Sequence, residues 1–327
     1  MGLIERPRRL RSTPVLRAMV RETRLDPASL ILPLFIREGI QEPRPIDGMP
    51  GVVQHTKDSF SREIDLAVKA GIGGVMIFGI PEERDARGSQ ALDPDGVLAS
   101  AIRAARAQVH DDLVITGDLC LDEFTSHGHC GLLNSKGIVD NDATLEMYGQ
   151  MAQVLAAAGA HMLGTSGMMD GQVGAVRKAL DAAEFTEVLI LAYAAKYASA
   201  FYGPFRDAVE SQLEGDRRSY QQDPGNFKEA LREVRLDIAE GADIIMVKPA
   251  LAYLDVLYAT SQAVDVPTAS YIVSGEMAMV EAAAAQGSLE RERGILEILS
   301  SVKRAGATII CTYWALEAAE LIKRGSQ

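Results

Sequence analysis

Cysteine is scarce in this chain: Cys120, Cys130 and Cys311 are the only three in 327 residues. An odd set of three is too small for a disulfide framework, so it argues against a disulfide-rich secreted protein. The same scarcity leaves two uses for each thiol, metal binding or burial.

Positive charge is also in short supply, because 33 Lys and Arg residues face 45 Asp and Glu residues, for a formal net charge of −12. Nucleic-acid-binding proteins concentrate Lys and Arg to displace counterions, so we expect no nucleic-acid partner. The sequence contains a single basic cluster, formed by Arg6, Arg8, Arg9 and Arg11. We expect it to be either a solvated N-terminal arm or an arm that docks on a neighbouring subunit.

Long apolar runs are missing as well. None approaches the ~18 residues that a membrane span needs, and no apolar segment of signal-peptide type follows the basic start. We therefore expect no membrane partner and a cytoplasmic location. With 47% hydrophobic and 24% charged residues, the chain has the composition of a globular protein with a sizeable core.

A short phrase recurs where helical patterns end: AGIGGVMIFG, AGAHMLGTS, EGADIIMVKP and AGATIICTY. In each, a glycine stops a helix and a strand follows directly. Short apolar runs separated by helical periodicity predict βα units and a parallel sheet. The predicted strands span 30–36, 74–80, 113–121, 161–166, 187–195, 243–249, 268–274 and 307–313.

Eight strands with helical crossovers favour a closed α/β barrel, the (β/α)8 TIM barrel, over an open doubly wound sheet. We expect one catalytic barrel over 30–327 and an N-terminal arm over 1–29 that contacts the rest of an oligomer. Pro33 is an exception inside the first strand, since proline belongs at strand edges. The predicted helix 227–240 carries an apolar face and has Asn226 as its cap.

Two long loops follow the third and fifth strands, DEFTSHGHCGLLNSKGIVDND and YGPFRDAVESQLEGDRRSYQQDPGN. Loops after barrel strands lie at the C-terminal face, where active sites are built. Long loops of this kind often act as lids.

Two of only nine lysines end apolar strands: Lys196 closes VLILAYAAK, and Lys248 lies in DIIMVKPA. In a closed barrel such side chains must point into the mouth or the core. Burial and a neighbouring cation both lower a lysine pKa, so two lysines in one pocket would activate each other as nucleophiles. The alternative is a lysine that extends to solvent at the barrel rim.

The segment DLCLDEFTSHGHCG holds a second constellation. Asp118, Cys120 and Asp122 share one face of an extended strand, and the Gly-rich loop can return Cys130 to them. Cys120, Asp122 and Cys130 offer two thiolates and a carboxylate, the three-ligand form of a catalytic zinc site. The alternative is that Cys120 is a buried apolar thiol.

For several other polar residues the sequence gives weaker evidence of a functional role. His127 and His129 are either ligands or locally hydrogen-bonded loop histidines, and we expect Cys311 in the core. Arginines of the long loop after Lys196 suit substrate carboxylates, or form a solvated lid face. The candidates that end strands and could hydrogen-bond a ligand are Ser166, Ser274 and Tyr313.

Together these stretches resemble the porphobilinogen synthase family, also called 5-aminolevulinate dehydratase, along essentially the whole chain. The most specific pieces are FTSHGHCG, SGMMDGQVGAVR, AKYASAFYGPFRDA, GDRRSYQ, MVKPA and YIVSGE. The resemblance implies condensation of two 5-aminolevulinate molecules to a pyrrole with loss of two waters, in tetrapyrrole (heme) biosynthesis. It also implies a homo-octamer, because the arm matches the family's.

The resemblance assigns roles residue by residue. Lys196 and Lys248 match the Schiff-base lysines, and Lys248 would bind the molecule that becomes the propionate side. The residues implied for the carboxylate of the second molecule are Arg206, Arg217 and Gln221. Ser274 and Tyr313 are the residues implied for the carboxylate of the first molecule.

The sequence departs from the family at the metal segment, where zinc-type members carry three cysteines. The hybrid of Cys120, Asp122 and Cys130 keeps two soft thiolates, so we expect Zn²⁺ rather than Mg²⁺ in the active site. Gly167 stands where the family commonly has Asp, so the role of that carboxylate is either absent or supplied elsewhere, with Asp118 as the candidate catalytic carboxylate. Glu233 matches a glutamate that binds an allosteric Mg²⁺ in some bacterial members, or is a solvated helix residue.

Two other functions stay open from the sequence. One is a different lysine-dependent lyase of the class I aldolase kind, although no Gly-rich phosphate-binding turn follows the seventh or eighth strand. The other is a non-catalytic barrel that senses a ligand or a metal, because fold does not imply function.

Overall fold

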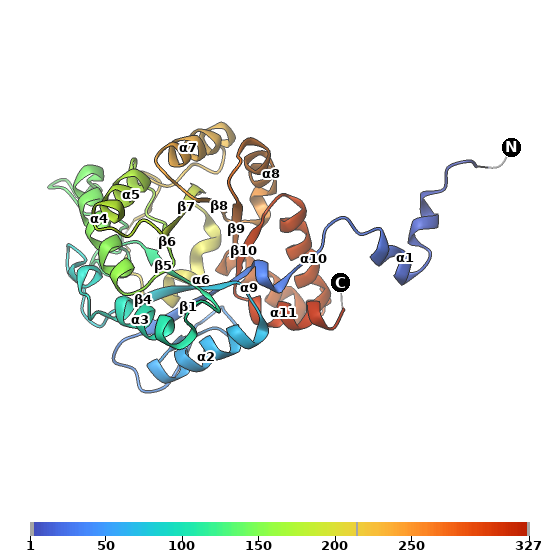
Figure 1. The fold of residues 1–327 in the computed structure, drawn as a ribbon, viewed down its shortest axis with the longest axis horizontal. Coiled ribbons are helices and arrows are strands. Elements are labelled where there is room, and N and C mark those ends of the chain that lie inside the picture. The colour runs from blue at the N-terminus through green and yellow to red at the C-terminus, as the bar shows by residue number, and fades with distance from the viewer. Residues whose placement is uncertain (1–2, 214, 326–327) are drawn as a thin grey trace.

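The computed structural model describes residues 3–213 and 215–325, and its centre is a closed barrel of parallel strands (Figure 1). Eight barrel strands lie side by side in chain order within the described residues. They are β1 (Leu30–Arg37), β4 (Gly74–Ile80), β5 (Val114–Leu119), β6 (Met162–Thr165), β7 (Leu189–Lys196), β8 (Ile244–Lys248), β9 (Thr268–Ile272) and β10 (Ile309–Thr312). Pairing of Leu30 with Ile310 and of Ile31 with Cys311 closes the barrel. The predicted (β/α)8 barrel is confirmed.

All eight predicted strands are present, and most are shorter than predicted at their C-terminal ends. The apolar run 113–121, for example, leaves the sheet after Leu119. Burial explains the difference, because Cys120 and Leu121 are as buried as the strand although they no longer pair with a neighbour. Apolar character therefore marks the core, and not only the hydrogen-bonded ladder.

Pro33 lies in β1 where that strand has only one partner. β1 pairs with β4 along 31–37, but with β10 only at Leu30 and Ile31, and with the short strand β3 (Val53–His55) only at Phe35 and Ile36. Pro33 falls in the gap between the last two pairings. The missing N–H therefore interrupts no ladder on that side.

Helices surround the barrel (Figure 1). They are α2 (Lys57–Ala70), α3 (Val97–Val109), α4 (Asn141–Ala157), α5 (Gln172–Ala182), α7 (Phe227–Ala239), α8 (Leu254–Ala263), α9 (Ser274–Ala285), α10 (Arg291–Arg304) and α11 (Ala315–Lys323). Gly71 ends α2 with a φ of 70°, as the recurring phrase predicts. The expected side-chain cap of α7 is wrong: Asn226 occupies the cap position, but its amide donates to Glu229 Oε2, 2.7 Å away, and not to the helix backbone.

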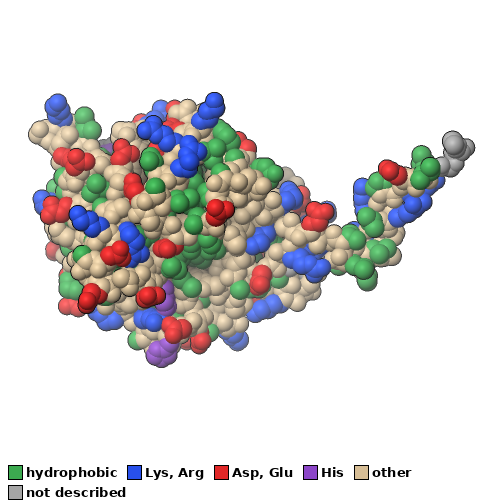
Figure 2. All heavy atoms as spheres, turned by 45° about the horizontal axis from the view of Figure 1, so that its top comes forward, with side chains coloured by type: hydrophobic (Ala, Val, Ile, Leu, Met, Phe, Trp, Pro, Cys, Tyr) green, Lys and Arg blue, Asp and Glu red, His purple; other side chains and the backbone are tan. Residues whose placement is uncertain are grey.

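The N-terminal residues project away from the barrel as an arm (Figures 1 and 2). The described part of the predicted arm, residues 3–29, contains α1 (Pro14–Met19) and two 3₁₀ turns; Met1 and Gly2 lie outside the described residues. Apolar and basic side chains lie together on its surface (Figure 2). Its exposed apolar residues are Leu3, Ile4, Leu10, Val15, Met19 and Val20.

Among the described residues, no helix has both the length and the apolar character that crossing a membrane requires.

Candidate active site

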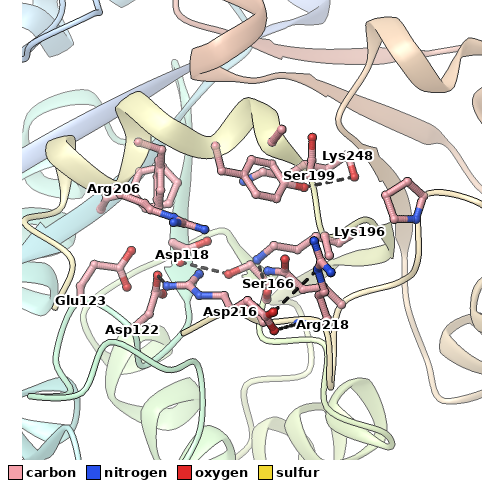
Figure 3. A pocket seen from close by; sticks show the side chains of 18 residues that line it. Asp118, Asp122, Glu123, Ser166, Lys196, Ser199, Arg206, Asp216, Arg218 and Lys248 are labelled. Carbon is pink, nitrogen blue, oxygen red and sulfur yellow. Dashed lines mark hydrogen bonds and ion pairs between the residues drawn. The ribbon is translucent and has the colours of Figure 1, made fainter. Parts of the chain in front are cut away.

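The two strand-end lysines face each other across neighbouring strands. Lys196 ends β7 and Lys248 ends β8, and the two residues are register partners. A break in the register between Ala192 and Ala195 of β7 brings them level. Both side chains are buried, with exposed fractions of 5% and 6%. Neither lysine extends to solvent at the rim, so the pair shares one enclosed site (Figure 3).

Lys248 lies within a box of aromatic rings. Its Nζ is 4.2 Å from the centre of the Tyr271 ring, and the rings of Tyr193, Phe205 and Tyr202 lie 5.2 to 5.5 Å away. Burial, and then the positive charge of Lys196, lower the pKa of Lys248 to about 8. A lysine with this pKa has an appreciable neutral fraction near neutral pH, which is the form that attacks a carbonyl carbon.

A chain of hydrogen bonds joins the second lysine to an acid. Lys196 Nζ donates to the carbonyl oxygen of Ser166, 2.5 Å away, and Ser166 Oγ donates to Asp118 Oδ2, 3.1 Å away. Burial and the nearby Asp122 raise the pKa of Asp118 to about 7, against the opposing effect of the two lysines. A carboxyl group with this pKa can both give and accept a proton at neutral pH.

These groups surround a cavity of about 420 Å³ at the barrel mouth (Figure 3). The predicted site residues that line it are Lys196, Lys248, Asp118, Asp122, Ser166, Arg206, Arg217 and Gln221. The loop after β7 covers the mouth with α6 (Gly203–Ala208), which crosses the centre of the barrel in Figure 1. The loop therefore lies where a lid is expected.

Two predicted substrate residues lie outside this wall. Ser274 is fully buried at the start of α9, and its Oγ accepts from the N–H of Phe205, 3.0 Å away. Tyr313 follows β10, and its hydroxyl is hydrogen-bonded to that of Tyr271 at 3.2 Å. Each of them is thus hydrogen-bonded to a residue whose aromatic ring lies close to Lys248 Nζ, with Phe205 at 5.3 Å and Tyr271 at 4.2 Å.

The predicted metal ligands converge. The ligand atoms of Cys120, Asp122 and Cys130 all lie within 4.8 Å of one another, and all three side chains are buried. Burial raises the pKa of the Cys120 thiol, whereas hydrogen bonding with that thiol lowers the pKa of Cys130. Two thiols and a carboxylate gathered in this way fit a borderline-soft divalent ion.

The loop histidines are hydrogen-bonded locally. His127 Nε2 contacts the carbonyl oxygen of Ala86 at 3.2 Å, and His129 Nδ1 contacts the Tyr220 hydroxyl at 3.1 Å. They are in neither of the two metal-ligand groups found among the described residues. Cys311 is fully buried, as predicted.

An ion pair ties the lid to the metal segment. Arg217 Nη2 donates to Asp122 Oδ2, 2.8 Å away, and to the carbonyl oxygen of Gly128, 2.9 Å away. Although burial raises the pKa of Asp122, Arg217 and Lys196 hold it below its usual value. Arg217 Nε and Gln221 Nε2 are buried donors without a hydrogen-bond partner among the described residues. Such donors favour binding of a carboxylate in the cavity.

A second set of contacts fixes the other end of α6 to the barrel rim. Glu210 Oε1 accepts from Arg37 Nε at 3.1 Å and from Gln54 Nε2 at 3.3 Å. Arg84 donates to the carbonyl oxygen of Glu123 at 2.7 Å and to that of Val209 at 3.0 Å. The Glu210 clasp, by which we mean Arg37, Gln54, Arg84 and Glu210, joins the lid to both β1 and the metal segment.

Sequence reasoning missed several residues of the wall. Glu123 is 2% exposed and lines the cavity, and burial together with Asp122 and Asp118 raises its pKa well above its usual value. Its position next to Asp122 in the sequence was the available signal. Tyr202 and Phe205 also line the cavity, and both belong to the sequence segment AKYASAFYGPFRDA, which contains the predicted site residue Arg206.

A steric restriction explains why a glycine occupies position 167. A Cβ at this position would lie 2.0 Å from the Tyr148 hydroxyl, which hydrogen-bonds the Cys130 carbonyl oxygen. Tyr148 is fully buried, so it has no room to yield. A side chain at 167 is therefore excluded while Tyr148 supports the metal segment.

Glu233 lies away from the lysines, on α7, where it lines two other cavities. Burial, followed by repulsion from Asp170 and Glu229, raises its pKa. It is therefore half-buried among carboxylates and not a freely solvated helix residue.

A closed (β/α)8 barrel whose mouth holds two buried lysines and a covering loop defines a lysine-dependent TIM-barrel enzyme. Comparisons with known proteins narrow this class. The delta-aminolevulinic acid dehydratase family, as represented by its sequence model, matches residues 4–321. The chain belongs to this family, and it is a lyase.

Relatives of this chain match it along nearly its full length. Delta-aminolevulinic acid dehydratase of Streptomyces coelicolor is 59% identical over 320 residues, 97% of each chain. The Mycobacterium tuberculosis enzyme is 56% identical over 317 residues, 96% of each chain. The crystal structure of the Toxoplasma gondii enzyme in complex with its product porphobilinogen has a TM-score of 0.94 and 41% identity, covering 97% of this chain and 91% of that one.

Proposed function

We propose that this chain condenses two molecules of 5-aminolevulinate to porphobilinogen with release of two waters, by Schiff-base catalysis, in tetrapyrrole (heme) biosynthesis. The observation that carries the proposal is the register pairing of Lys196 and Lys248 in one buried cavity. The family and its relatives supply the substrate.

Lys248 is the first nucleophile. Its neutral amine adds to the ketone carbon of the first molecule, and loss of water leaves a protonated C=N bond. The aromatic box around Nζ excludes water from this bond and stabilises its positive charge by cation–π contact. Lys196 forms the corresponding bond with the second molecule, beside the acid that Ser166 links to it.

Asp118 moves protons between the two condensing molecules. Its pKa of about 7 and its contact with Ser166 suit a group that accepts a proton in one step and returns it in another. Asp118 takes the place of the carboxylate that the family carries at position 167.

Carboxylate binding is divided between the lid and the barrel. Arg206, Arg217 and Gln221 hold the carboxylate of the second molecule, supported by the unpartnered donors of Arg217 and Gln221. Ser274 and Tyr313 hold that of the first. Because neither residue lines the cavity, this second assignment requires side chains of the cavity wall to shift when the substrate binds.

Zn²⁺ is the metal that the donor set favours. Cys120, Asp122 and Cys130 would hold it, and the bound ion would supply Lewis-acid polarisation of a substrate oxygen. Mg²⁺ fits the carboxylates around Glu233 better, because it prefers oxygen ligands. That second ion would be allosteric, since Glu233 does not line the lysine cavity.

The assembled enzyme is a homo-octamer in the cytoplasm. Exposed apolar residues on the projecting arm support an oligomeric contact. Exposure of these side chains to water is unfavourable, and a neighbouring subunit that covers them would remove that cost.

The test is pyrrole formation from 5-aminolevulinate by the purified full-length chain, measured colorimetrically. We expect product from the wild type, at least a 1,000-fold loss in Lys248→Met as an order-of-magnitude estimate, and normal activity in the exposed control Lys69→Met. Binding of 5-aminolevulinate without any pyrrole would contradict the proposal and favour a sensor. Cleavage of a sugar phosphate instead would favour an aldolase.

A further inference from the structure

Five side chains with metal-ligand atoms crowd the floor of the barrel mouth, more than the proposed zinc site uses. They form two overlapping groups. One is Cys120, Asp122 and Cys130, and the other is Asp118, Cys120 and Glu123. In each group the ligand atoms lie within 4.8 Å of one another, and the two groups share Cys120.

Two carboxyl oxygens of the second group have no hydrogen-bond partner among the described residues. Asp118 Oδ1 and Glu123 Oε1 are buried and make no hydrogen bond. A buried polar atom in this state costs about 1–3 kcal/mol, and more when the group is ionised. The carboxylate of the first group differs, because Arg217 already contacts Asp122 Oδ2 at 2.8 Å.

Both carboxyl groups belong to the wall of the cavity. Asp118 is 4% exposed and Glu123 is 2% exposed, and both line the space that holds the lysines. Figure 3 shows the Glu123 carboxyl group turned toward Asp118 and Asp122. An ion that enters the mouth therefore meets these oxygens directly.

We propose that Asp118, Cys120 and Glu123 form a second divalent-cation site beside the Cys120, Asp122 and Cys130 set, with the Cys120 thiolate bridging the two ions. Two carboxylate oxygens and one thiolate select a borderline ion such as Zn²⁺ or Co²⁺ over Mg²⁺, which requires an octahedron of oxygens. A cation here gives both unpartnered oxygens a ligand bond. It would also hold Asp118 ionised, so the proton transfer proposed for Asp118 belongs to the chain without this second ion.

Charge supports a second ion. When ionised, the five side chains carry three carboxylates and two thiolates, and one divalent ion leaves a large negative excess in a buried site. Arg217 offsets one charge at Asp122, on the side of the first group. The second group has no comparable ion pair among the described residues. Lys196 and Lys248 offset part of the charge of Asp118, and a second ion would compensate the charge that remains on the group.

Cobalt binding tests the proposal without using catalytic activity, so its failure is distinct from failure of the proposed function. The full-length chain is stripped with a chelator and titrated with Co²⁺, while equilibrium dialysis counts bound ions and absorbance reports thiolate-to-cobalt bonds. The count is taken relative to Cys120→Ser, which lacks both sites, so that ions held by Glu233 and other surface carboxylates cancel.

We expect the wild type to bind two more ions per chain than Cys120→Ser does. Glu123→Gln and Cys130→Ser should each bind one more than Cys120→Ser, and both should keep a thiolate-to-cobalt band, because each removes a different site. The exposed control Glu83→Gln should match the wild type. A single additional ion in the wild type, or equal uptake by the wild type and Glu123→Gln, would overturn the second site; the wild-type count decides even if a variant fails to fold.

Discussion

The guanidinium of Arg217 contacts the carboxylate of Asp122 across 2.8 Å, so a lid residue and a candidate metal ligand form one buried ion pair. This ion pair links the loop after β7 to the metal segment through a single side chain. Truncating one partner of a buried charge pair leaves the other charge without compensation, which is costly.

Arg217→Leu should therefore weaken substrate binding strongly. We expect KM for 5-aminolevulinate to rise by roughly 10- to 100-fold, corresponding to about 1.4–2.8 kcal/mol, because both the carboxylate contact and the lid contact are lost. Steady-state kinetics measure this. Arg103→Leu is the matched control, since Arg103 is exposed, forms an ion pair with Asp95 and donates to the carbonyl oxygen of Pro94, and does not line the cavity. An unchanged KM in Arg217→Leu would remove the residue from the carboxylate site.

The pKa of Lys248 should control the pH dependence of Schiff-base formation. Only the neutral amine reacts, so the rate of trapping by cyanoborohydride should rise as pH increases through about 8 and then level off. At pH 7 about one Lys248 in ten is neutral, which is roughly 200-fold more than for an unperturbed lysine.

Removing the neighbouring charge should shift this profile in a defined direction. The positive charge of Lys196 disfavours the protonated form of Lys248 and lowers its pKa, so Lys196→Met should raise that pKa and move the midpoint to higher pH. Lys69→Met should leave the midpoint in place. A shift to lower pH in Lys196→Met would show that the two ammonium groups do not interact as the geometry indicates.

The Glu210 clasp should hold the lid in place. Glu210→Gln removes the charge that Arg37 contacts at 3.1 Å, and we expect KM to rise about 3- to 10-fold with a smaller change in kcat, at a cost of about 1 kcal/mol. Limited proteolysis within 209–226 should become faster. Glu187→Gln, on the exposed surface, should change neither property. If proteolysis is equally slow in all three proteins, the clasp does not fix the lid.

Gly167→Asp should disrupt the support of the metal segment. The new side chain collides with the Tyr148 hydroxyl, and overpacking of this kind costs about 1–3 kcal/mol of unfolding free energy. Tyr148→Phe removes that hydroxyl, so the double variant should recover part of the loss. Thermal or urea unfolding of the four proteins forms a double-mutant cycle. Purely additive effects would rule out a direct collision.

The barrel could be predicted from the sequence because each of its strands and helices has a local pattern of apolar residues and glycines. Apolar runs and helix-stopping glycines predicted all eight strands, and loop length placed Lys196 and Lys248 at the functional face. The pairing of those two lysines followed from the fold, since neighbouring parallel strands end at one edge.

What the sequence could not supply is side-chain direction after the strands end. Ser274 and Tyr313 end their apolar runs as Ser166 does, yet only Ser166 lines the cavity. The hydroxyls of Ser274 and Tyr313 instead form hydrogen bonds with Phe205 and Tyr271, and no local pattern encodes these contacts. The Asn226 cap failed for a similar reason, because its amide contacts Glu229. Nothing in the local sequence distinguishes Glu123 from other acidic loop residues, but in the structure it is buried and lines the cavity.

Borohydride reduction in the presence of 5-aminolevulinate, followed by peptide mass analysis, will detect a Schiff base on Lys248. We expect a substrate-dependent mass increase on the peptide containing Lys248, absent in Lys248→Met and absent without substrate. Reduction that labels other lysines but leaves Lys248 unmodified in active enzyme would contradict Schiff-base formation at Lys248.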